Sequence, residues 1–303
     1  MLRFFPTPYP GESIYSILSR YHQRSGNRSH SQTRNELFKY PVSLLFTIVA
    51  PLYHFSMKAW DLPESSISWY QLVQKHSLLP LLEFLVPRQV DNYRNTLRRS
   101  SATSKIPSAW SISARIASCF TEDFRVLKYC PHCAREQVIA YGEPYWEILP
   151  QCWNVTLCPI HGTPYIESTV CEKQIATQFI PASRAISLSE IPPAAPSKES
   201  LDFHISRTMH WLMENSPCLM PFFSHEEELL KPSNLPKLKE RVTSSCRLPS
   251  RYSSSAYSKV RAALSMLCQG YKTFTDLLDV YELIAFLGGY FRTDEELDQF
   301  FLK

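Results

Sequence analysis

The chain has 303 residues, of which 44% are hydrophobic and 13% aromatic, and its formal net charge at pH 7 is +4. This composition can bury a large apolar core, so it excludes an intrinsically disordered chain. The longest apolar run, residues 42–55, is too short for a membrane span, and residues 1–6 lack the apolar core of a signal peptide, so we expect a cytoplasmic protein with no membrane partner.

Residues 11–22 are the first segment with a clear helical pattern. Their apolar residues recur at i, i+3, i+4 and i+7, which predicts an amphipathic helix with a buried stripe of Ile14, Ile17, Leu18 and Tyr21. A polar turn at residues 25–31 leads to a second short helix, predicted at 32–38. Some helix pairs of this kind read DNA and most are ordinary packing units, so both interpretations stay open.

Positive charge is concentrated in two stretches of the sequence. Further helices are predicted at 68–76, 79–85 and 88–99, and residues 88–135 hold nine Lys or Arg against three carboxylates. Residues 237–261 hold seven against one. Such stretches favour a polyanionic partner, here double-stranded DNA. The candidate phosphate contacts are Arg94, Arg98, Arg99, Lys105, Arg115, Arg125, Lys128, Lys237, Lys239, Arg241, Arg247 and Arg251.

Two short hooks, C-P-H-C and C-P-I-H, stand 24 residues apart in the middle of the chain. Zn²⁺ takes four Cys or His ligands in a tetrahedron, and two ligands separated by two residues can hold it from one tight turn. The sequence therefore predicts a closed, structural zinc site with the ligands Cys130, Cys133, Cys158 and His161. We expect the aromatic residues between the hooks to pack beneath the metal.

The other cysteines and one histidine allow alternatives. Cys130 and Cys133 could form an isolated redox pair, but the matching second hook and the absence of a βαβ pattern favour zinc. His132 and Cys152 lack the ligand spacing, so we expect structural roles for both. The remaining cysteines are expected to be small buried hydrophobic residues: Cys119, Cys171, Cys218, Cys246 and Cys268.

No motif of a known enzyme class accompanies the hooks. No H-x-E precedes them, as it does in zinc deaminases, and the chain has no H-E-x-x-H, no phosphate-binding loop and no G-x-S-x-G elbow. The sequence therefore predicts no catalytic residues and no small-molecule substrate.

The Pro- and Ala-rich residues 191–197 are the clearest linker. Helices are predicted beyond it at 201–214, 224–230, 255–269, 273–287 and 293–301, and Thr293 with Glu296 forms a capping box for the last. We therefore expect a mainly α protein with three parts: an N-terminal helical domain at 1–120 with a helix-turn-helix-like element, an embedded zinc-ribbon or knuckle module at 121–190, and a C-terminal helical bundle domain at 201–303.

The sequence resembles the TniQ/TnsD family of transposon target-selection proteins in three stretches, which together cover roughly residues 4–165. Residues 5–16, F-P-T-P-Y-P-G-E-S-I-Y-S, resemble that family's opening F-P-x-P-Y-x-x-E-x-x-Y-S, and residues 76–82, H-S-L-L-P-L-L, resemble its H-T-L-F-P-L-Y. The third stretch is similar to its zinc module: Y-C-P-x-C at 129–133, Y-G-E at 141–143, Trp146 and C-P-x-H-G at 158–162.

The resemblance implies a non-enzymatic, DNA-targeting subunit of a bacterial transposition system, cytoplasmic and associated with the nucleoid. Such a protein marks an attachment site and recruits an AAA+ ATPase regulator, which calls in the transposase. The alternative within the family is an adaptor that joins an RNA-guided CRISPR effector to the same regulator. The four zinc ligands carry over to this sequence, whereas individual DNA contacts do not.

The length of the chain departs from one branch of the family. Direct DNA binders of the TnsD type are typically much longer, with further C-terminal DNA-binding domains. A piece of a direct binder and a naturally shorter adaptor both remain open. The basic stretch next to the hooks favours direct DNA contact.

Overall fold

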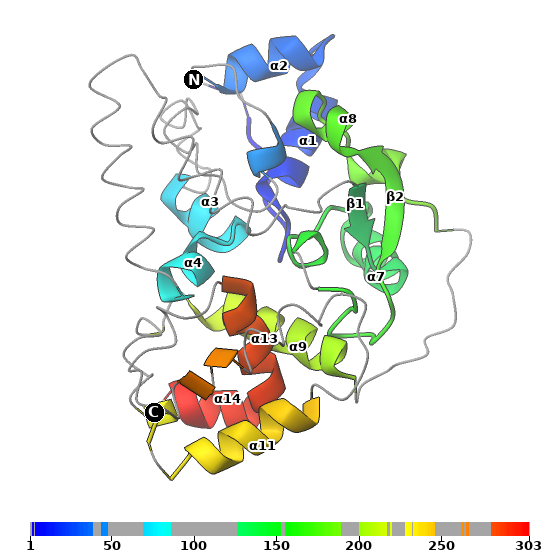
Figure 1. Cartoon of the computed structure of the whole chain (residues 1–303). Helices are drawn as coiled ribbons and strands as arrows, with labels where there is room; N and C mark the ends of the chain where they lie inside the picture. Colours follow the sequence, from blue (N-terminus) through cyan, green and yellow to red (C-terminus); the bar gives the residue numbers. More distant parts are fainter. Residues whose placement is uncertain are drawn as a thin grey trace, which may run out of the picture. The chain divides into compact units, whose positions relative to one another are not determined.

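The computed structural model is mainly helical (Figure 1). It describes residues 2, 4–38, 44–47, 69–85, 126–152, 155–188, 200–216, 219, 228–231, 233–245, 262–263, 265–266 and 280–302. No helix in these ranges is long and apolar enough to span a bilayer. The described residues form two compact units.

The first unit combines helices with one small sheet. Its helices are α1 (Ile14–Ser25), α2 (His30–Leu37), α3 (Trp69–His76), α7 (Pro131–Tyr141) and α8 (Glu172–Thr177), with 3-10 turns η1 (Leu44–Thr47), η3 (Leu149–Gln151) and η4 (Ala182–Arg184). Strands β1 (Val126–Tyr129) and β2 (Ile166–Cys171) pair antiparallel, with Lys128 opposite Glu167 and Tyr129 opposite Ile166. This two-stranded ladder lies beside α7 in Figure 1.

Helix α1 forms the centre of this unit. Its predicted stripe is buried, with Ile14, Ile17 and Leu18 at 0% exposure and Tyr21 at 2%. Ser13 caps the helix by accepting a hydrogen bond from the backbone N–H of Ser16, and Gly26 ends it at φ 74°, a left-handed conformation that favours glycine. Residues 26–29 then connect α1 to α2, where Ser29 is the N-cap.

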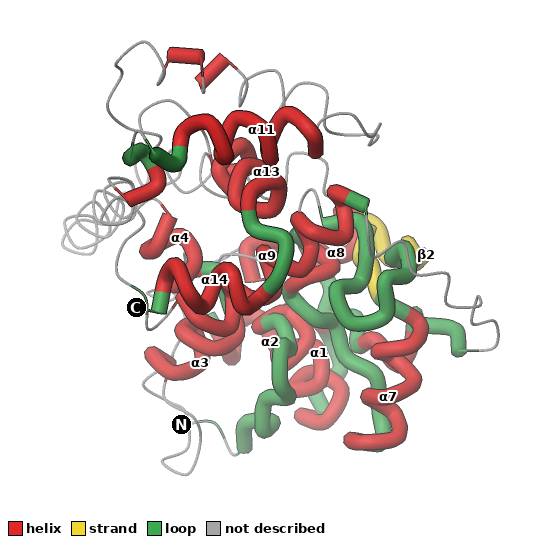
Figure 2. The backbone as a smooth tube through the Cα atoms, turned by 90° about the horizontal axis from the view of Figure 1, so that it is seen from below, coloured by secondary structure: helices red, strands yellow, loops and turns green. Residues whose placement is uncertain are grey.

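The second unit is built from helices α4 (Leu79–Leu85), α9 (Leu201–Asn215), α11 (Leu235–Ser245), α13 (Val280–Tyr290) and α14 (Asp294–Phe301). Helix α13 packs against both α9 and α11, which flank it in Figure 2. Phe301 of α14 contacts the rings of Phe84 and Trp211, at centroid distances of 5.6 and 5.9 Å. Two ion pairs connect α14 to the neighbouring helices: Asp294 pairs with Arg207 of α9, and Glu296 pairs with Arg241 of α11.

Gly288 sets how closely α13 approaches α9. A Cβ atom at this position would lie 2.8 Å from the backbone Cα of Ile205, which is closer than real Cβ contacts. Alanine usually stabilises a helix relative to glycine by up to about 1 kcal/mol. We expect Gly288→Ala to do the opposite and to lower the free energy of unfolding by about 1 to 3 kcal/mol, because the helices must separate. Urea unfolding measures this, and equal or greater stability of the variant would contradict the close approach.

Most predicted helices in the described ranges are confirmed. Those predicted at 11–22, 32–38, 68–76, 79–85, 201–214 and 293–301 correspond to α1, α2, α3, α4, α9 and α14. Helix α13 covers the end of the predicted 273–287 and continues to Tyr290, and the described residues of 224–230 and 255–269 include helical ones. The helix predicted at 88–99 lies outside the described residues.

The sequence did not predict helices α7, α8 and α11 or the β1–β2 ladder. The local sequence signals for these elements are weak. Helix α7 starts inside the first hook, whose cysteine spacing indicated a turn, and the strands that pair are separated by about 40 residues of sequence. The predicted capping box is present in part: Thr293 Oγ1 accepts from the Glu296 N–H, but the Glu296 carboxylate accepts from the N–H of Arg292 instead of Thr293.

Candidate metal centre and the motif residues around it

The first hook lies where β1 passes into α7. Cys130 is the N-cap residue of α7, in extended conformation at φ −90° and ψ 123°, and Pro131 occupies the first turn of the helix, where its missing N–H is not needed. Cys133 therefore lies on that first turn, on the same side as the cap. Both cysteines are buried, at 1% and 6% exposure. The strand and the helix together fix the two thiols.

The second hook is a tight turn. The N–H of Gly162 donates to the carbonyl oxygen of Cys158 at 2.7 Å, and Gly162 has φ 68°, which favours glycine. Within the turn, the backbone N–H of His161 lies 3.4 Å from Cys158 Sγ, and His161 Nδ1 lies 3.5 Å from the same sulfur. The turn thus directs a thiol and an imidazole toward one point.

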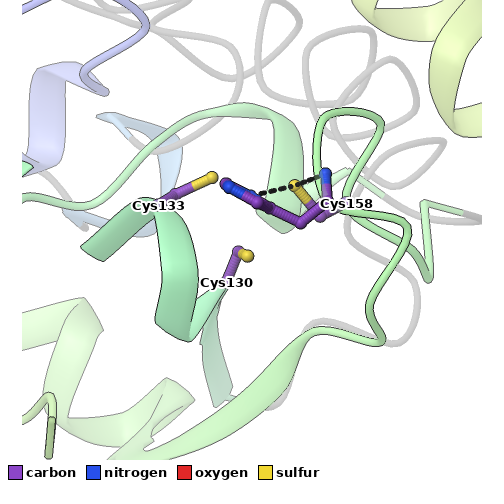
Figure 3. A group of neighbouring side chains, drawn as sticks. Cys130, Cys133 and Cys158 are labelled. Atoms are coloured by element: carbon purple, nitrogen blue, oxygen red, sulfur yellow. Dashed lines mark hydrogen bonds between the residues drawn. The ribbon is translucent and has the colours of Figure 1, made fainter. Parts of the chain in front are cut away.

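The two hooks meet. One potential ligand atom from each of Cys130, Cys133, Cys158 and His161 lies within 4.8 Å of the others, and the three cysteines are buried and not in disulfides. Figure 3 shows the three sulfur atoms facing a common space. Four such ligands around a zinc ion, at about 2.0 to 2.3 Å from it, would have separations of this order. The cluster could hold a metal ion, and it is compatible with a zinc module.

A hydroxyl that sequence reasoning missed touches this cluster. Thr163 Oγ1 lies 3.5 Å from Cys130 Sγ, and Thr163 is 2% exposed. A hydroxyl can donate to a thiolate and orient it, as partners of metal ligands commonly do. Its position directly after the C-P-x-H-G motif is the only sequence signal for it.

The cysteines outside the cluster give one confirmation and one correction. Cys152 is fully buried, its S–H donates to the Ile148 carbonyl at 3.6 Å, and burial raises its pKa to about 12, so it is a neutral structural thiol. Cys171 was predicted to be buried and is exposed, because it ends β2 and forms the N-cap of α8. His132 is half-buried on α7 outside the cluster. Cys119, Cys218, Cys246 and Cys268 lie outside the described residues.

Glu12 of the opening motif forms a buried ion pair with Arg20. Glu12 is 0% and Arg20 2% exposed, and Arg20 Nη1 donates to Glu12 Oε2 at 2.8 Å. Glu12 also accepts from the backbone N–H of Tyr9 and from the hydroxyl of Ser16. Burial raises the pKa of Glu12 to about 7, and the Arg20 charge opposes that shift. A charged pair in this position requires all of these partners.

Glu143, from the Y-G-E motif between the hooks, joins the same network. Its Oε1 accepts from Arg20 Nε at 2.8 Å, and Arg24 pairs with the same oxygen. The Tyr9 hydroxyl also donates to it, and the Arg20 guanidinium lies 3.7 Å from the centroid of the Tyr9 ring. The opening motif and the inter-hook motif thus share one arginine.

The aromatic residues between the hooks contact the opening segment and strand β1. Tyr141 stacks on Tyr9 at a centroid distance of 4.5 Å, and Tyr145 lies 5.2 Å from the same ring. These tyrosines pack against the opening segment, and their place beneath the metal stays a prediction. Trp146 is fully buried, with its ring edge-on to Tyr129 at 6.4 Å and its Nε1–H donating to the Ile180 carbonyl.

Backbone hydrogen bonds connect the same segments. The Ser13 N–H donates to the Trp146 carbonyl at 2.9 Å, the Ile148 N–H donates to the Gly11 carbonyl at 3.0 Å, and Glu12 and Glu147 form an antiparallel bridge. The second stretch of the resemblance, residues 76–82, also meets this bridge, because His76 Nδ1 lies 2.8 Å from the Glu12 carbonyl oxygen. The structure therefore brings the three motif stretches together.

Three of the basic residues singled out for DNA can be placed with their side chains. Lys237 is exposed on α11 and Lys128 is half-buried on β1. Arg241 binds both carboxylate oxygens of Glu296 at 3.0 and 3.1 Å, so its guanidinium has a partner inside the second unit. Lys239 lies in α11 without a described side chain, and the others lie outside the described residues: Arg94, Arg98, Arg99, Lys105, Arg115, Arg125, Arg247 and Arg251.

Comparisons with known proteins identify a family and a relative of this chain. The family model of TniQ matches residues 3–164. The transposition protein TnsD of transposon Tn7 from Escherichia coli is 28% identical over 163 residues, which are 53% of this chain and 31% of TnsD. The match thus spans about a third of that relative's length. The residues that match the family model, 3–164, contain the opening motif, both hooks and every residue of the ion-pair network.

Proposed function

This chain belongs to the TniQ family, and from that membership we propose that it selects the target site of a transposition system. The single observation that carries the proposal is the family match over residues 3–164. The likeness to the Tn7 transposition protein TnsD supports it. Arg20 joins two of the motif stretches, since it pairs with both Glu12 and Glu143.

In this function the hooks hold Zn²⁺. Cys130, Cys133, Cys158 and His161 would supply all four ligands, and a closed shell leaves no position for a reacting water. The metal would therefore supply stability, by fastening the start of α7 to the turn at Cys158. Thr163 would orient the Cys130 thiolate through its hydroxyl.

We propose that the protein contacts duplex DNA itself and recruits an AAA+ ATPase regulator of the transposase. The basic stretches at 88–135 and 237–261 would neutralise phosphates. Among their described basic residues, Arg135 and Lys237 are exposed. The second candidate is an adaptor that joins an RNA-guided CRISPR effector to the regulator, and the neutralised Arg241 and the small net charge of +4 favour it.

Capture of genomic fragments by the purified protein, followed by sequencing, tests direct target selection. We expect one enriched site, bound at least about 10³-fold more tightly than a scrambled duplex at physiological salt. The affinity should also fall steeply between 50 and 200 mM salt. Equal affinity for both duplexes would refute direct readout. A complex with an RNA-guided effector that survives nuclease digestion would then establish the adaptor.

A further inference from the structure

Two histidines stand side by side where α1 ends and α2 begins. The rings of His22 and His30 have centroids 4.4 Å apart, and both rings contact Phe179, at 5.5 and 6.2 Å. Both side chains are half-buried, so part of each ring meets solvent. Neither ring belongs to the metal cluster or to the ion-pair network of Arg20. Their arrangement has no role in the function described above.

Hydrogen bonds fix the tautomer of His30. The backbone N–H of Phe179 donates to His30 Nδ1 at 3.2 Å, so this nitrogen is an acceptor and carries no proton. The proton of the neutral ring is therefore on Nε2, across the ring from Phe179. The Nε2–H of His30 is therefore a donor on the side of the ring opposite the Phe179 backbone.

His22 is fixed in the same way by a chain of three side chains. The Asn27 amide nitrogen donates to the Glu36 carboxylate at 2.6 Å and to Thr33 Oγ1 at 3.0 Å. Thr33 is fully buried, and among the described residues His22 Nδ1, 2.6 Å away, is the acceptor within reach of its hydroxyl proton, so the hydroxyl donates to that nitrogen. His22 Nδ1 is thus also an acceptor, and its Nε2 carries the proton. Within the described part of the chain, no acceptor contacts Nε2 of either ring.

Cationic side chains accompany these two donors. Arg184, the last residue of η4, is exposed, and Arg34 of α2 is half-buried; neither has a carboxylate partner among the described residues. Both charges act on the rings: burial and then Arg184 and Arg34 lower the pKa of His30, and burial, His30 and Arg184 lower that of His22. The acidic residue in this region, Glu36, is bound by Asn27. The surface therefore offers donors and positive charge to an anion.

We propose that His22, His30 and Arg184, with Arg34 beside them, bind backbone phosphates of duplex DNA. Two uncharged N–H donors next to a guanidinium match the oxygens of a phosphate group, and such contacts position a protein on DNA without reading its sequence. The inference rests on the proposed direct DNA contact. It places a phosphate-binding surface at the helix pair, outside both basic stretches of the sequence.

The test measures binding of the full chain to a 30-base-pair duplex by fluorescence anisotropy over a salt series. His30→Asn keeps an acceptor for the Phe179 N–H and removes the Nε2 donor, whereas Arg184→Gln removes an exposed charge. Lys75→Gln, an exposed residue of α3, is the control for loss of one charge. We expect each test variant to weaken binding, and Arg184→Gln to reduce the slope of log K against log salt by about 0.9.

The outcomes separate the inference from the proposed function. Salt-dependent binding by the wild type with unchanged affinity and slope in both test variants would overturn the phosphate surface alone. Absence of salt-dependent DNA binding by the wild type would overturn direct DNA contact and this surface with it. Unchanged DNA binding with lost capture of the ATPase regulator would assign the surface to an acidic protein instead. Melting curves of all variants show that each is folded.

Discussion

Replacing Cys130 with serine is expected to abolish metal binding and to unfold the region around the hooks. Structural zinc contributes roughly 10 to 16 kcal/mol in small zinc modules, which is comparable to or larger than the whole stability of about 5 to 15 kcal/mol of a typical domain. Cys130 is both a member of the buried Cys and His cluster and the N-cap residue of α7, and its replacement leaves that cluster incomplete. Loss of target selection would follow indirectly from unfolding.

Zinc content by mass spectrometry and amide exchange in α7 and around Cys158 measure this result. Cys171→Ser is the matched control, since Cys171 is exposed and outside the cluster. Chelation of the wild-type protein should reproduce the behaviour of Cys130→Ser. A Cys130→Ser protein that lost target selection while retaining full zinc content and an unchanged melting profile would contradict a structural metal.

Replacing Arg20 with methionine is expected to be the most damaging change outside the metal cluster. It leaves Glu12 buried without its cation, and breaking a buried ion pair in this way costs about 3 to 5 kcal/mol. Glu143 also loses a partner, but Arg24 still pairs with it. Chemical unfolding of the purified variant measures the cost. The double variant Arg20→Met, Glu12→Gln should recover part of it, because no uncompensated charge remains.

The loss of stability in Arg20→Met should depend on pH. Burial raises the pKa of Glu12 to about 7 in the folded wild type, against an ordinary value of 4.5. Between those two values the folded state binds more protons than the unfolded state, so the contribution of Glu12 to stability decreases as pH rises. Without Arg20 the pKa of Glu12 in the folded state rises further. The pH range over which Glu12 loses its contribution to stability therefore extends to higher pH. The deficit of Arg20→Met should therefore be larger at pH 8.5 than at pH 6, and a constant deficit would argue against Glu12 as its source.

The features that the sequence predicted correctly depend on short spacing. The two clustered residues within each hook are three positions apart, and the stripe of α1 repeats every three or four residues, so each pattern is visible in one window. The exposure of Cys171 was missed because small apolar composition does not reveal that a strand ends there.

The partners of the motif residues could not be predicted, because the contacts are remote in sequence. The Y-G-E motif indicated a family, yet nothing local showed that Glu143 meets Arg20 or that Tyr141 stacks on Tyr9. The histidine pair was equally invisible, since His22 and His30 become neighbours only when the turn at 26–29 folds α2 back toward α1. Thr163 lacks any spacing rule that relates it to Cys130.

The two ion pairs of Arg20 can form only in a fixed order during synthesis of the chain. Arg20 and Glu143 are 123 residues apart, whereas Arg20 and Glu12 are only 8 apart. At about 5 to 20 residues per second, the ribosome adds Glu143 roughly 6 to 25 seconds after Arg20. During that interval α1 can form its local ion pair, but the apolar stripe that it later buries has no complete partner surface. The nascent N-terminal segment therefore keeps apolar side chains exposed until the inter-hook motif has been made.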